Sequence, residues 1–167
     1  MEASRFHRLM EEALVEARRG LSEGEVPVGA IVADQDGRIL GRGHNQPVAL
    51  NDPTAHAEIS ALRRAGALVG NYRLTGAALV VTIEPCIMCM GAAIQARVGL
   101  LVYGSMDPKS GAAGSLYDFS GDSRLNHQVK IVSGVLEEEC RDLLVRFFKD
   151  RRKAAAYERN GEVPKWP

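Results

Sequence analysis

The apolar residues near the start of the chain recur at intervals of three or four positions. Over residues 5–22 this spacing places one apolar stripe along a helix whose other face is charged. The members of the stripe are Phe6, Leu9, Met10, Ala13, Leu14, Ala17 and Leu21. The pattern predicts an amphipathic helix that buries one side and ends before Gly24.

Five segments have the composition of β-strands. Residues 26–33 are rich in Val and Ile, and the turn sequence of residues 34–37 leads into a second apolar pair, which predicts a β-hairpin. Residues 77–83 form a nearly continuous apolar run, as expected for a central strand covered on both faces. The remaining predicted strands are residues 98–103 and 129–132.

Helical patterns occur between and after these strands. They predict a helix over residues 56–65 and a short, mostly apolar helix over residues 86–97, with Pro85 at its start. From Leu136 onward acidic residues come first and basic residues later, the order that the helix dipole favours. Loops are predicted for residues 45–53 and 104–127, the second long enough to suggest a function.

The alternation of strands and helices is typical of an α/β protein in which helices cover both faces of one sheet. We therefore predict a three-layer α/β/α sandwich that begins with an antiparallel hairpin. A chain of 167 residues has the length of one ordinary domain. We expect residues 1–167 to form a single domain, with a basic C-terminal helix at about 136–160.

The composition is that of a folded globular protein, with 46% hydrophobic and 25% charged residues. Basic and acidic residues both total 21, so attraction to a nucleic acid has to come from a local patch. The first twenty residues lack the apolar centre of a secretory signal, and no apolar run reaches the roughly 18 residues of a membrane span. With three cysteines, two of them in a C-x-x-C pair, these features predict a cytoplasmic protein without a disulfide scaffold.

One histidine and two cysteines form a candidate metal site. His56 precedes one predicted helix, and Cys86 and Cys89 share a face at the start of another. An imidazole and two thiolates are the ligand number expected for catalytic zinc, which keeps a water molecule in its fourth position. Zinc lowers the pKa of that water to about 7, and the carboxylate of Glu58 is suited to pass its proton to a leaving group.

Other interpretations of these residues remain open. Residues two apart on a regular helix point in nearly opposite directions, so His56 and Glu58 converge only if His56 lies at the irregular helix start. Glu58 could instead be a fourth ligand of a structural site, the cysteines alone could form a redox dithiol, and His56 alone could be a core or capping residue. We expect Cys140 to be a buried, inert thiol, and His7, His44 and His127 to have surface or loop roles.

Several segments resemble one enzyme family. His56-Ala57-Glu58 followed by Pro85-Cys86-Ile87-Met88-Cys89 is similar to the signature of the cytidine deaminase-like zinc enzymes. Further matching segments are EVPVGA at 25–30, Asn45, DPTAHAE at 52–58, NYRL at 71–74 and GAAGS at 111–115. Over about residues 5–155 the chain resembles the bacterial tRNA-specific adenosine deaminases.

The resemblance implies hydrolytic deamination of the wobble adenosine in a tRNA anticodon to inosine, by a homodimer with one zinc ion per subunit. It implies a five-stranded mixed sheet of the cytidine deaminase-like fold. In that chemistry zinc-activated water attacks the amino-bearing carbon of the purine, Glu58 shuttles protons and ammonia leaves, while His56, Cys86 and Cys89 hold the metal. The residues implied for substrate contact are Asn45, Val28, Gly29, Ala30, a backbone N–H near Ala57, and Asp107.

The balanced net charge conceals a basic C-terminal segment. Residues 146–167 contain seven bases and three acids, net +4, whereas residues 1–145 contain 14 bases and 18 acids, net −4. We expect Arg151 and Arg152 to contact RNA phosphates, and the two Phe residues at 147–148 to lie in the core. Affinity for tRNA should then fall steeply as salt is added.

Two other functions compete with this interpretation. A member of the same superfamily could deaminate a free base or nucleoside, such as guanine or cytosine, with the same zinc chemistry. The loop at 107–115 and the basic tail argue against it, because a small substrate needs neither. The other alternative is a catalytically idle zinc module that binds RNA, and the presence of Glu58 argues against that.

Overall fold

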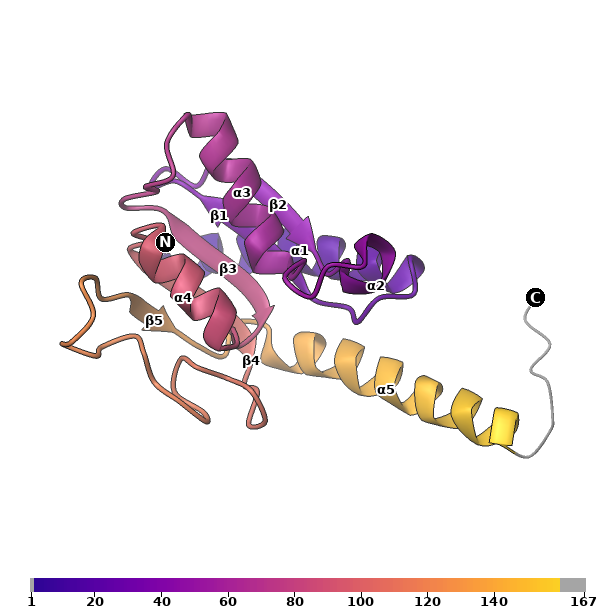
Figure 1. Cartoon of the computed structure of the whole chain (residues 1–167). Helices are drawn as coiled ribbons and strands as arrows, with labels where there is room; N and C mark the ends of the chain where they lie inside the picture. Colours follow the sequence, from indigo (N-terminus) through magenta and orange to yellow (C-terminus); the bar gives the residue numbers. More distant parts are fainter. Residues whose placement is uncertain (1, 160–167) are drawn as a thin grey trace.

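The structure is a computed structural model that describes residues 2–159. Its strands are β1 (Gly29–Ala33), β2 (Ile39–His44), β3 (Ala78–Ile83), β4 (Leu100–Ser105) and β5 (Lys130–Val132). In the described range these five strands form one sheet in the order β2-β1-β3-β4-β5, so the strand expected at the centre is central (Figure 1). Strand β1 is antiparallel to β2 and β3, whereas β3, β4 and β5 are parallel, which makes the sheet mixed as the resemblance implied.

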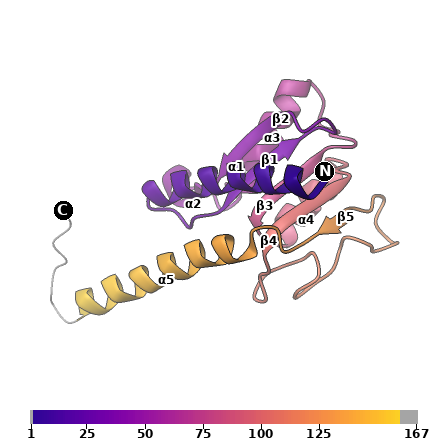
Figure 2. The same cartoon turned by 180° about the vertical axis from the view of Figure 1, so that it is seen from behind.

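Helices cover both faces of this sheet, which confirms the predicted α/β sandwich. They are α1 (Glu2–Ser22), α2 (Pro47–Leu50), α3 (Ala57–Val69), α4 (Ile87–Gln95) and α5 (Glu137–Arg159). Helix α1 lies on the face seen from behind in Figure 2, and α3 and α4 lie on the opposite face. Alternate residues of β1 serve the two layers, because Ile31 packs with Leu9 of α1 and Val32 packs with Ala61 of α3.

Helix α3 lies directly on β2 because two residues of that strand are glycines. A Cβ atom at Gly41 would lie 2.2 Å from the carbonyl oxygen of Ala61, and one at Gly43 would lie 2.2 Å from that of Ala57. Both distances are far inside van der Waals contact, so only glycine permits the close approach. The end of β2 and the first turn of α3 are therefore held side by side, and both lead into the candidate site.

Several element boundaries differ from the sequence prediction, among them the starts of α1 at Glu2 and of β1 at Gly29. The predicted loop at 45–53 contains the four-residue helix α2. Helix α4 begins at Ile87 with Cys86 as its N-cap, so Pro85 precedes the helix and does not occupy its first position. The helix predicted to end near residue 65 extends to Val69.

One member of the predicted apolar stripe of α1 lies outside the core. Leu21 has an exposed fraction of 38%, whereas Ala17, one turn earlier, is fully buried. Leu21 lies in the last turn of the helix, next to the exposed turn that follows. The buried stripe therefore ends one turn before the helix does.

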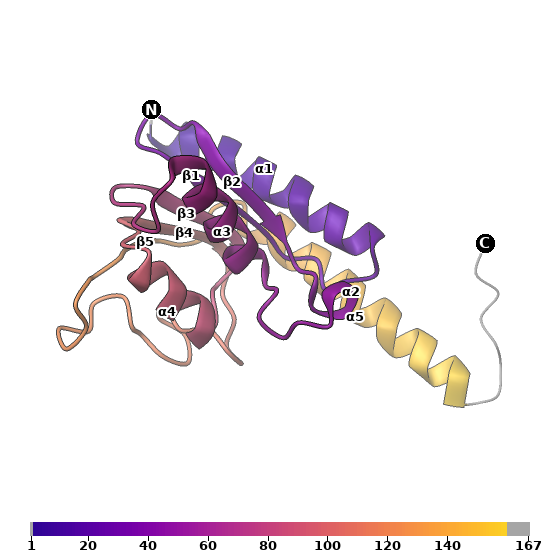
Figure 3. The ribbon, with the colours of Figure 1, turned by 45° about the horizontal axis from the view of Figure 1, so that its top comes forward.

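The connection from β4 to β5, residues 106–129, contains no helix or named strand in the described structure. Isolated bridges join Cys86 to Gly111 and Ala113 to Asp118 within or across this connection. Helix α5 starts against β4 and then extends away from the sheet (Figure 3). Among the described residues, no helix combines the length and apolar character required to cross a membrane.

Candidate metal centre and active site

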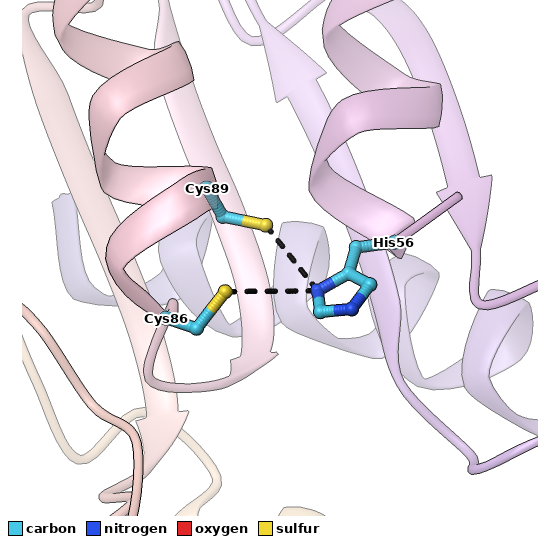
Figure 4. A group of neighbouring side chains, drawn as sticks. All are labelled: His56, Cys86 and Cys89. Atoms are coloured by element: carbon cyan, nitrogen blue, oxygen red, sulfur yellow. Dashed lines mark hydrogen bonds between the residues drawn. The ribbon is translucent and has the colours of Figure 1, made fainter. Parts of the chain in front are cut away.

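Three side chains from two helix starts converge on one point (Figure 4). His56 is the N-cap of α3 in an extended conformation, φ −74° and ψ 156°, so it lies at the irregular helix start that convergence requires. Cys86 is the N-cap of α4, and Cys89 lies in the first turn of the same helix. The Nδ1 atom of His56 lies 3.7 Å from Sγ of Cys86 and 3.5 Å from Sγ of Cys89.

These distances fit a tetrahedral zinc ion. Zn–S bonds of about 2.3 Å and Zn–N bonds of about 2.0 Å place nitrogen and sulfur ligands roughly 3.6 Å apart at a tetrahedral angle. The possible ligand atoms of His56, Cys86 and Cys89 all lie within 4.8 Å of one another, and in the described part of the chain Glu58 is not a member of this group. The three residues could therefore hold a metal ion through one nitrogen and two sulfur atoms, and in the described residues Glu58 is not grouped with them as a fourth ligand.

The side chains of the site alter one another's acidity. A hydrogen bond with Cys89 lowers the pKa of the Cys86 thiol to about 4, and a hydrogen bond with His56 acts in the same direction. The same bond between the cysteines, together with burial, raises the pKa of Cys89. The hydrogen bond with Cys86 raises the pKa of His56, and burial raises the pKa of Glu58. Binding of a divalent metal needs both sulfurs as thiolates, so it would release protons from this site.

A cavity of about 580 Å³ opens above the cluster. Seven of the residues predicted from the sequence line it, namely Val28, Asn45, His56, Glu58, Cys86, Asp107 and Arg152. Glu58 is only 3% exposed, and it lies in the first turn of α3, two residues after His56. The cavity therefore brings His56 and Cys86, a buried carboxylate and a polar amide to one place, while Cys89 lies behind them and does not line it.

Three of the predicted substrate contacts lie in the backbone that supports the cavity and not on its walls. The backbone N–H of Gly29 donates to Thr82 Oγ1 at 3.2 Å, and Ala30 is fully buried in β1. The N–H of Ala57, expected to hold the base, donates to Asn45 Oδ1 at 3.0 Å. Contact of Gly29, Ala30 and Ala57 with a substrate stays a prediction.

Two other predicted contacts have partners within the chain. The carboxylate of Asp107 accepts the backbone N–H groups of Lys109 and Ser110, at 3.0 and 3.3 Å, and also the Ser110 hydroxyl, so it caps its own turn. Arg151 is exposed, and its guanidinium carbon lies 5.9 Å from the ring centroid of Phe147. Arg152, by contrast, lines the cavity.

The prediction of a surface or loop role for His44 was wrong. His44 is 5% exposed at the end of β2, and its two ring nitrogens each lie 3.1 Å from a carboxylate oxygen, one of Glu16 and one of Glu23. Both carboxylates come from α1 or the turn after it, and Glu16 is itself 1% exposed. The imidazole therefore ties the strand that leads to Asn45 to the helix behind the sheet.

For the other residues singled out from the sequence, the structure agrees with some predicted positions and not with others. His7 is exposed, and His127 is half-buried with Nε2 2.6 Å from the carbonyl oxygen of Val98. Cys140 is 1% exposed, and burial raises its pKa to about 12, which confirms the buried thiol. The core position expected for Phe148 is wrong, since it is 45% exposed and lines the cavity, while Phe147 is half-buried.

The sequence reasoning missed most of the apolar and basic cavity wall. These lining residues are Val26, Ile83, Met106, Lys109, Arg141, Leu144, Val145 and Phe148. It also missed Glu84, a 2% exposed carboxylate directly before the Pro-Cys pair of the metal motif. An acidic residue between an apolar strand and a ligand motif was a signal that could have singled it out.

Comparison with known proteins identifies the class of enzyme to which the chain belongs. Residues 3–105 match the family model for the cytidine and deoxycytidylate deaminase zinc-binding region, a range that contains His56, Cys86 and Cys89. The fold and the three-ligand site agree with this match. The chain therefore belongs to this family of zinc-binding deaminases and is a zinc-dependent hydrolytic deaminase.

Individual relatives indicate to which group within these deaminases the chain belongs. A tRNA-specific adenosine deaminase from Haemophilus influenzae is 44% identical over 152 residues, which are 91% of this chain and 88% of that protein. A solved structure from work on A-to-I editing by tRNA:A34 deaminases at the wobble position of transfer RNA has a TM-score of 0.79 at 44% identity, covering 82% of this chain and 99% of that chain. Within the deaminases, the chain belongs with the tRNA-specific adenosine deaminases.

A guanine deaminase from Nitrosomonas europaea shares the fold. Its structure has a TM-score of 0.75 at 24% identity and covers 84% of this chain and 83% of that chain. At this identity the likeness concerns the fold alone. The choice between a tRNA and a free base as substrate therefore depends on the cavity and its rim.

Proposed function

We propose that the protein deaminates the wobble adenosine of a tRNA anticodon to inosine. The observation that carries this proposal is the three-ligand cluster at the base of an open cavity, with the buried Glu58 beside it. The 44% identity to a tRNA-specific adenosine deaminase over most of the chain supports the choice of substrate. The reaction consumes one water molecule and releases ammonia.

In this proposal His56, Cys86 and Cys89 hold zinc through one nitrogen and two sulfur atoms. Zinc bound there supplies a Lewis acid that lowers the pKa of water and makes a nucleophile available at neutral pH. The start of α4 supports the thiolates, because Cys86 is its N-cap and the positive end of a helix dipole favours an anion there. The ligand geometry leaves room for the substrate on the cavity side.

Glu58 carries the proton in our proposal. Its carboxylate takes a proton from the attacking water as the C–O bond forms, and returns it to the amino nitrogen as the C–N bond breaks. Burial raises the pKa of Glu58 and so favours the protonated state that the second transfer needs. The products are inosine and ammonia, so atoms and charge balance.

The cavity shape suits an unstacked base. The side chains of Val26, Val28 and Ile83 provide apolar surface for the flat faces of a purine, and Asn45 provides a polar group at its edge. A base reaches such a pocket only after it leaves its stack, which costs least in a single-stranded loop. An anticodon loop meets this requirement.

The rim of the cavity has the chemistry of an RNA-binding surface. Three cations line it, Lys109, Arg141 and Arg152, and the exposed side chains of Met106 and Phe148 lie among them. Cations can pair with phosphates while an aromatic ring stacks on a base. We propose that this rim contacts the anticodon strand on either side of the target base.

We also propose that the protein is a homodimer with one zinc ion per subunit. A second groove supports the dimer. A cavity of about 640 Å³ lies between α3 and α4, lined in part by Ile59, Leu62, Tyr72 and Ala92, and Tyr72 is 68% exposed. We propose that a second copy covers this face, with one zinc per subunit. Sedimentation should give a dimer that Tyr72→Glu weakens, and a wild-type monomer would contradict it.

The cellular compartment follows from the substrate in our proposal. The proposed substrate is an RNA of the translation machinery, and the cytoplasm keeps thiols reduced. All three cysteines are free in the structure. We therefore propose a cytoplasmic enzyme.

The competing substrate is a free base or nucleoside. The cationic rim favours RNA, because guanine, cytosine and adenosine carry no phosphate for it to bind. The test measures ammonia release from an anticodon stem-loop with adenosine at the wobble position, beside free guanine, cytosine and adenosine. We expect turnover with the stem-loop alone, and faster turnover of any free compound would refute the substrate assignment.

A further inference from the structure

Glu84 is a buried carboxylate that the deamination chemistry does not use. It follows β3, precedes Pro85 and the ligand Cys86, and is 2% exposed. Burying a carboxylate in this way is tolerable only if hydrogen-bond donors surround it. The identity of those donors shows what the carboxylate holds.

Four donors to Glu84 come from the segment of residues 106–115, which we call the 106–115 loop. Oε1 accepts the backbone N–H groups of Ala113 and Ser115, both at 2.9 Å. Oε2 accepts the N–H of Asp107 at 3.0 Å and the hydroxyl of Ser115. Each carboxylate oxygen thus accepts two hydrogen bonds, and together they bind both ends of the loop.

The middle of the loop is shaped to close over this carboxylate. A Cβ atom at Gly111 would lie 2.4 Å from Oε2 of Glu84 and 2.5 Å from the carbonyl oxygen of Asp107, so only glycine fits there. The N–H of Ala112 donates to the carbonyl oxygen of Pro85 at 2.8 Å, and Gly111 forms a bridge with Cys86. The loop therefore lies directly on the segment that carries a metal ligand.

We infer that Glu84 is a positioning residue that holds the 106–115 loop in the conformation in which residues 106–110 form one wall of the substrate cavity. This inference rests on the proposed function, because that wall is taken to contact the tRNA. A carboxylate is required: the amide of glutamine has one acceptor oxygen, so in either orientation it loses two of the four bonds. The NH₂ group of the glutamine would also face backbone N–H groups, with which it cannot form hydrogen bonds because both are donors.

The test compares Glu84→Gln with wild type in steady-state inosine formation on an anticodon stem-loop. When the binding-competent conformation becomes less populated, apparent affinity falls by the same factor. We expect KM to rise at least about tenfold, because bonds to a charged group are lost, while kcat changes less than about threefold. Zinc content should stay stoichiometric, and amide hydrogen exchange should accelerate within residues 106–115.

Two companion variants keep the test decisive. Ser115→Ala removes one donor and should raise KM by a smaller factor, even if Glu84→Gln fails to fold. Asp122→Asn is the matched control, since that acid lies in the same β4–β5 connection but pairs with the exposed Arg124 at 2.6 Å and does not line the cavity. Its KM should equal that of wild type.

Two results would overturn the inference. In the first, Glu84→Gln and Ser115→Ala keep the KM and the loop protection of wild type. In the second, Glu84→Gln loses zinc and kcat together without a change in KM, which would make Glu84 a support for the metal site. If wild type forms no inosine, the proposed substrate fails, whereas hydrogen exchange in the 106–115 loop still tests Glu84.

Discussion

The side-chain oxygen of Asn45 accepts the backbone N–H of Ala57 at 3.0 Å. Ala57 lies between the ligand His56 and the acid Glu58 in the first turn of α3, and Asn45 directly follows β2. One amide thus lines the cavity and also holds the helix start that presents the metal ligand. The side-chain oxygen of Asn45 is engaged in this hydrogen bond, so its side-chain nitrogen is the atom that remains to contact a substrate.

Substitutions of Asn45 should separate these two roles. Asn45→Asp keeps an acceptor oxygen at a helix start, so stability should stay within about 1 kcal/mol of wild type while inosine formation falls at least tenfold. Asn45→Ala leaves the Ala57 N–H unpaired and should lower the free energy of unfolding by about 1–3 kcal/mol as well. Urea denaturation and turnover measure both effects. An alanine variant as stable as wild type would show that the bond contributes nothing.

Replacing Glu58 should remove chemistry and leave the metal in place. Glu58→Gln retains the shape of the side chain but cannot accept and return a proton, so kcat should fall about 10²- to 10⁴-fold. Zinc measured by elemental analysis should remain stoichiometric, because Glu58 is not in the ligand group of the described structure. Loss of zinc in this variant would instead make Glu58 a ligand, and wild-type turnover would remove its proposed role.

Cys86 and Cys140 should differ in reactivity once zinc is removed. The pKa of Cys86 is lowered to about 4, whereas that of Cys140 is raised to about 12 by burial. Above its pKa a thiol is mostly thiolate, so alkylation of Cys86 by iodoacetamide should stay nearly constant between about pH 7 and 5.5. An ordinary thiol with a pKa near 8.5 would slow about thirtyfold over this interval.

Mass spectrometry after limited labelling assigns the modified residue. Cys140, 1% exposed, should stay unmodified, and added zinc should protect Cys86. Rapid labelling of Cys86 in the zinc-loaded protein would argue against its place in the metal site. Labelling that slows with falling pH would argue against its depressed pKa.

Binding of RNA should depend on salt through the cavity rim. Each phosphate contact contributes about 0.7 to the slope of log affinity against log salt for a single strand, so Arg152→Ala should reduce that slope by about this amount. Arg151→Ala should change it less, because its guanidinium lies on Phe147 and not at the cavity. Fluorescence anisotropy with a labelled stem-loop measures both slopes. Equal slopes for wild type and Arg152→Ala would exclude Arg152 as a phosphate contact.

The metal ligands could be identified from the sequence because short motifs contain them. Cys86 and Cys89 are three residues apart on one helix, and His56 had to lie at a helix start to converge with Glu58. The structure shows that start as an N-cap. The central position of β3 was similarly visible, because a strand covered on both faces is apolar at nearly every position.

The supports of the site could not be identified in this way, because their partners are distant in the chain. His44 contacts carboxylates 28 and 21 residues away, and Glu84 contacts donors 23 to 31 residues away. A local pattern of apolar and polar residues does not encode which buried charges face each other. The exposed position of Phe148 could not be predicted for a related reason, because helical spacing alone does not show where α5 leaves the sheet.

Stepwise return of zinc to metal-free protein measures whether deamination requires the metal. We expect inosine formation at the wobble position of unmodified tRNA to be absent without zinc and to rise linearly until one ion is bound per chain. His56→Ala, which removes the only nitrogen of the ligand group in the described structure, should bind zinc much more weakly and stay inactive. Full activity in protein shown to contain no metal would mean that the enzyme does not use zinc.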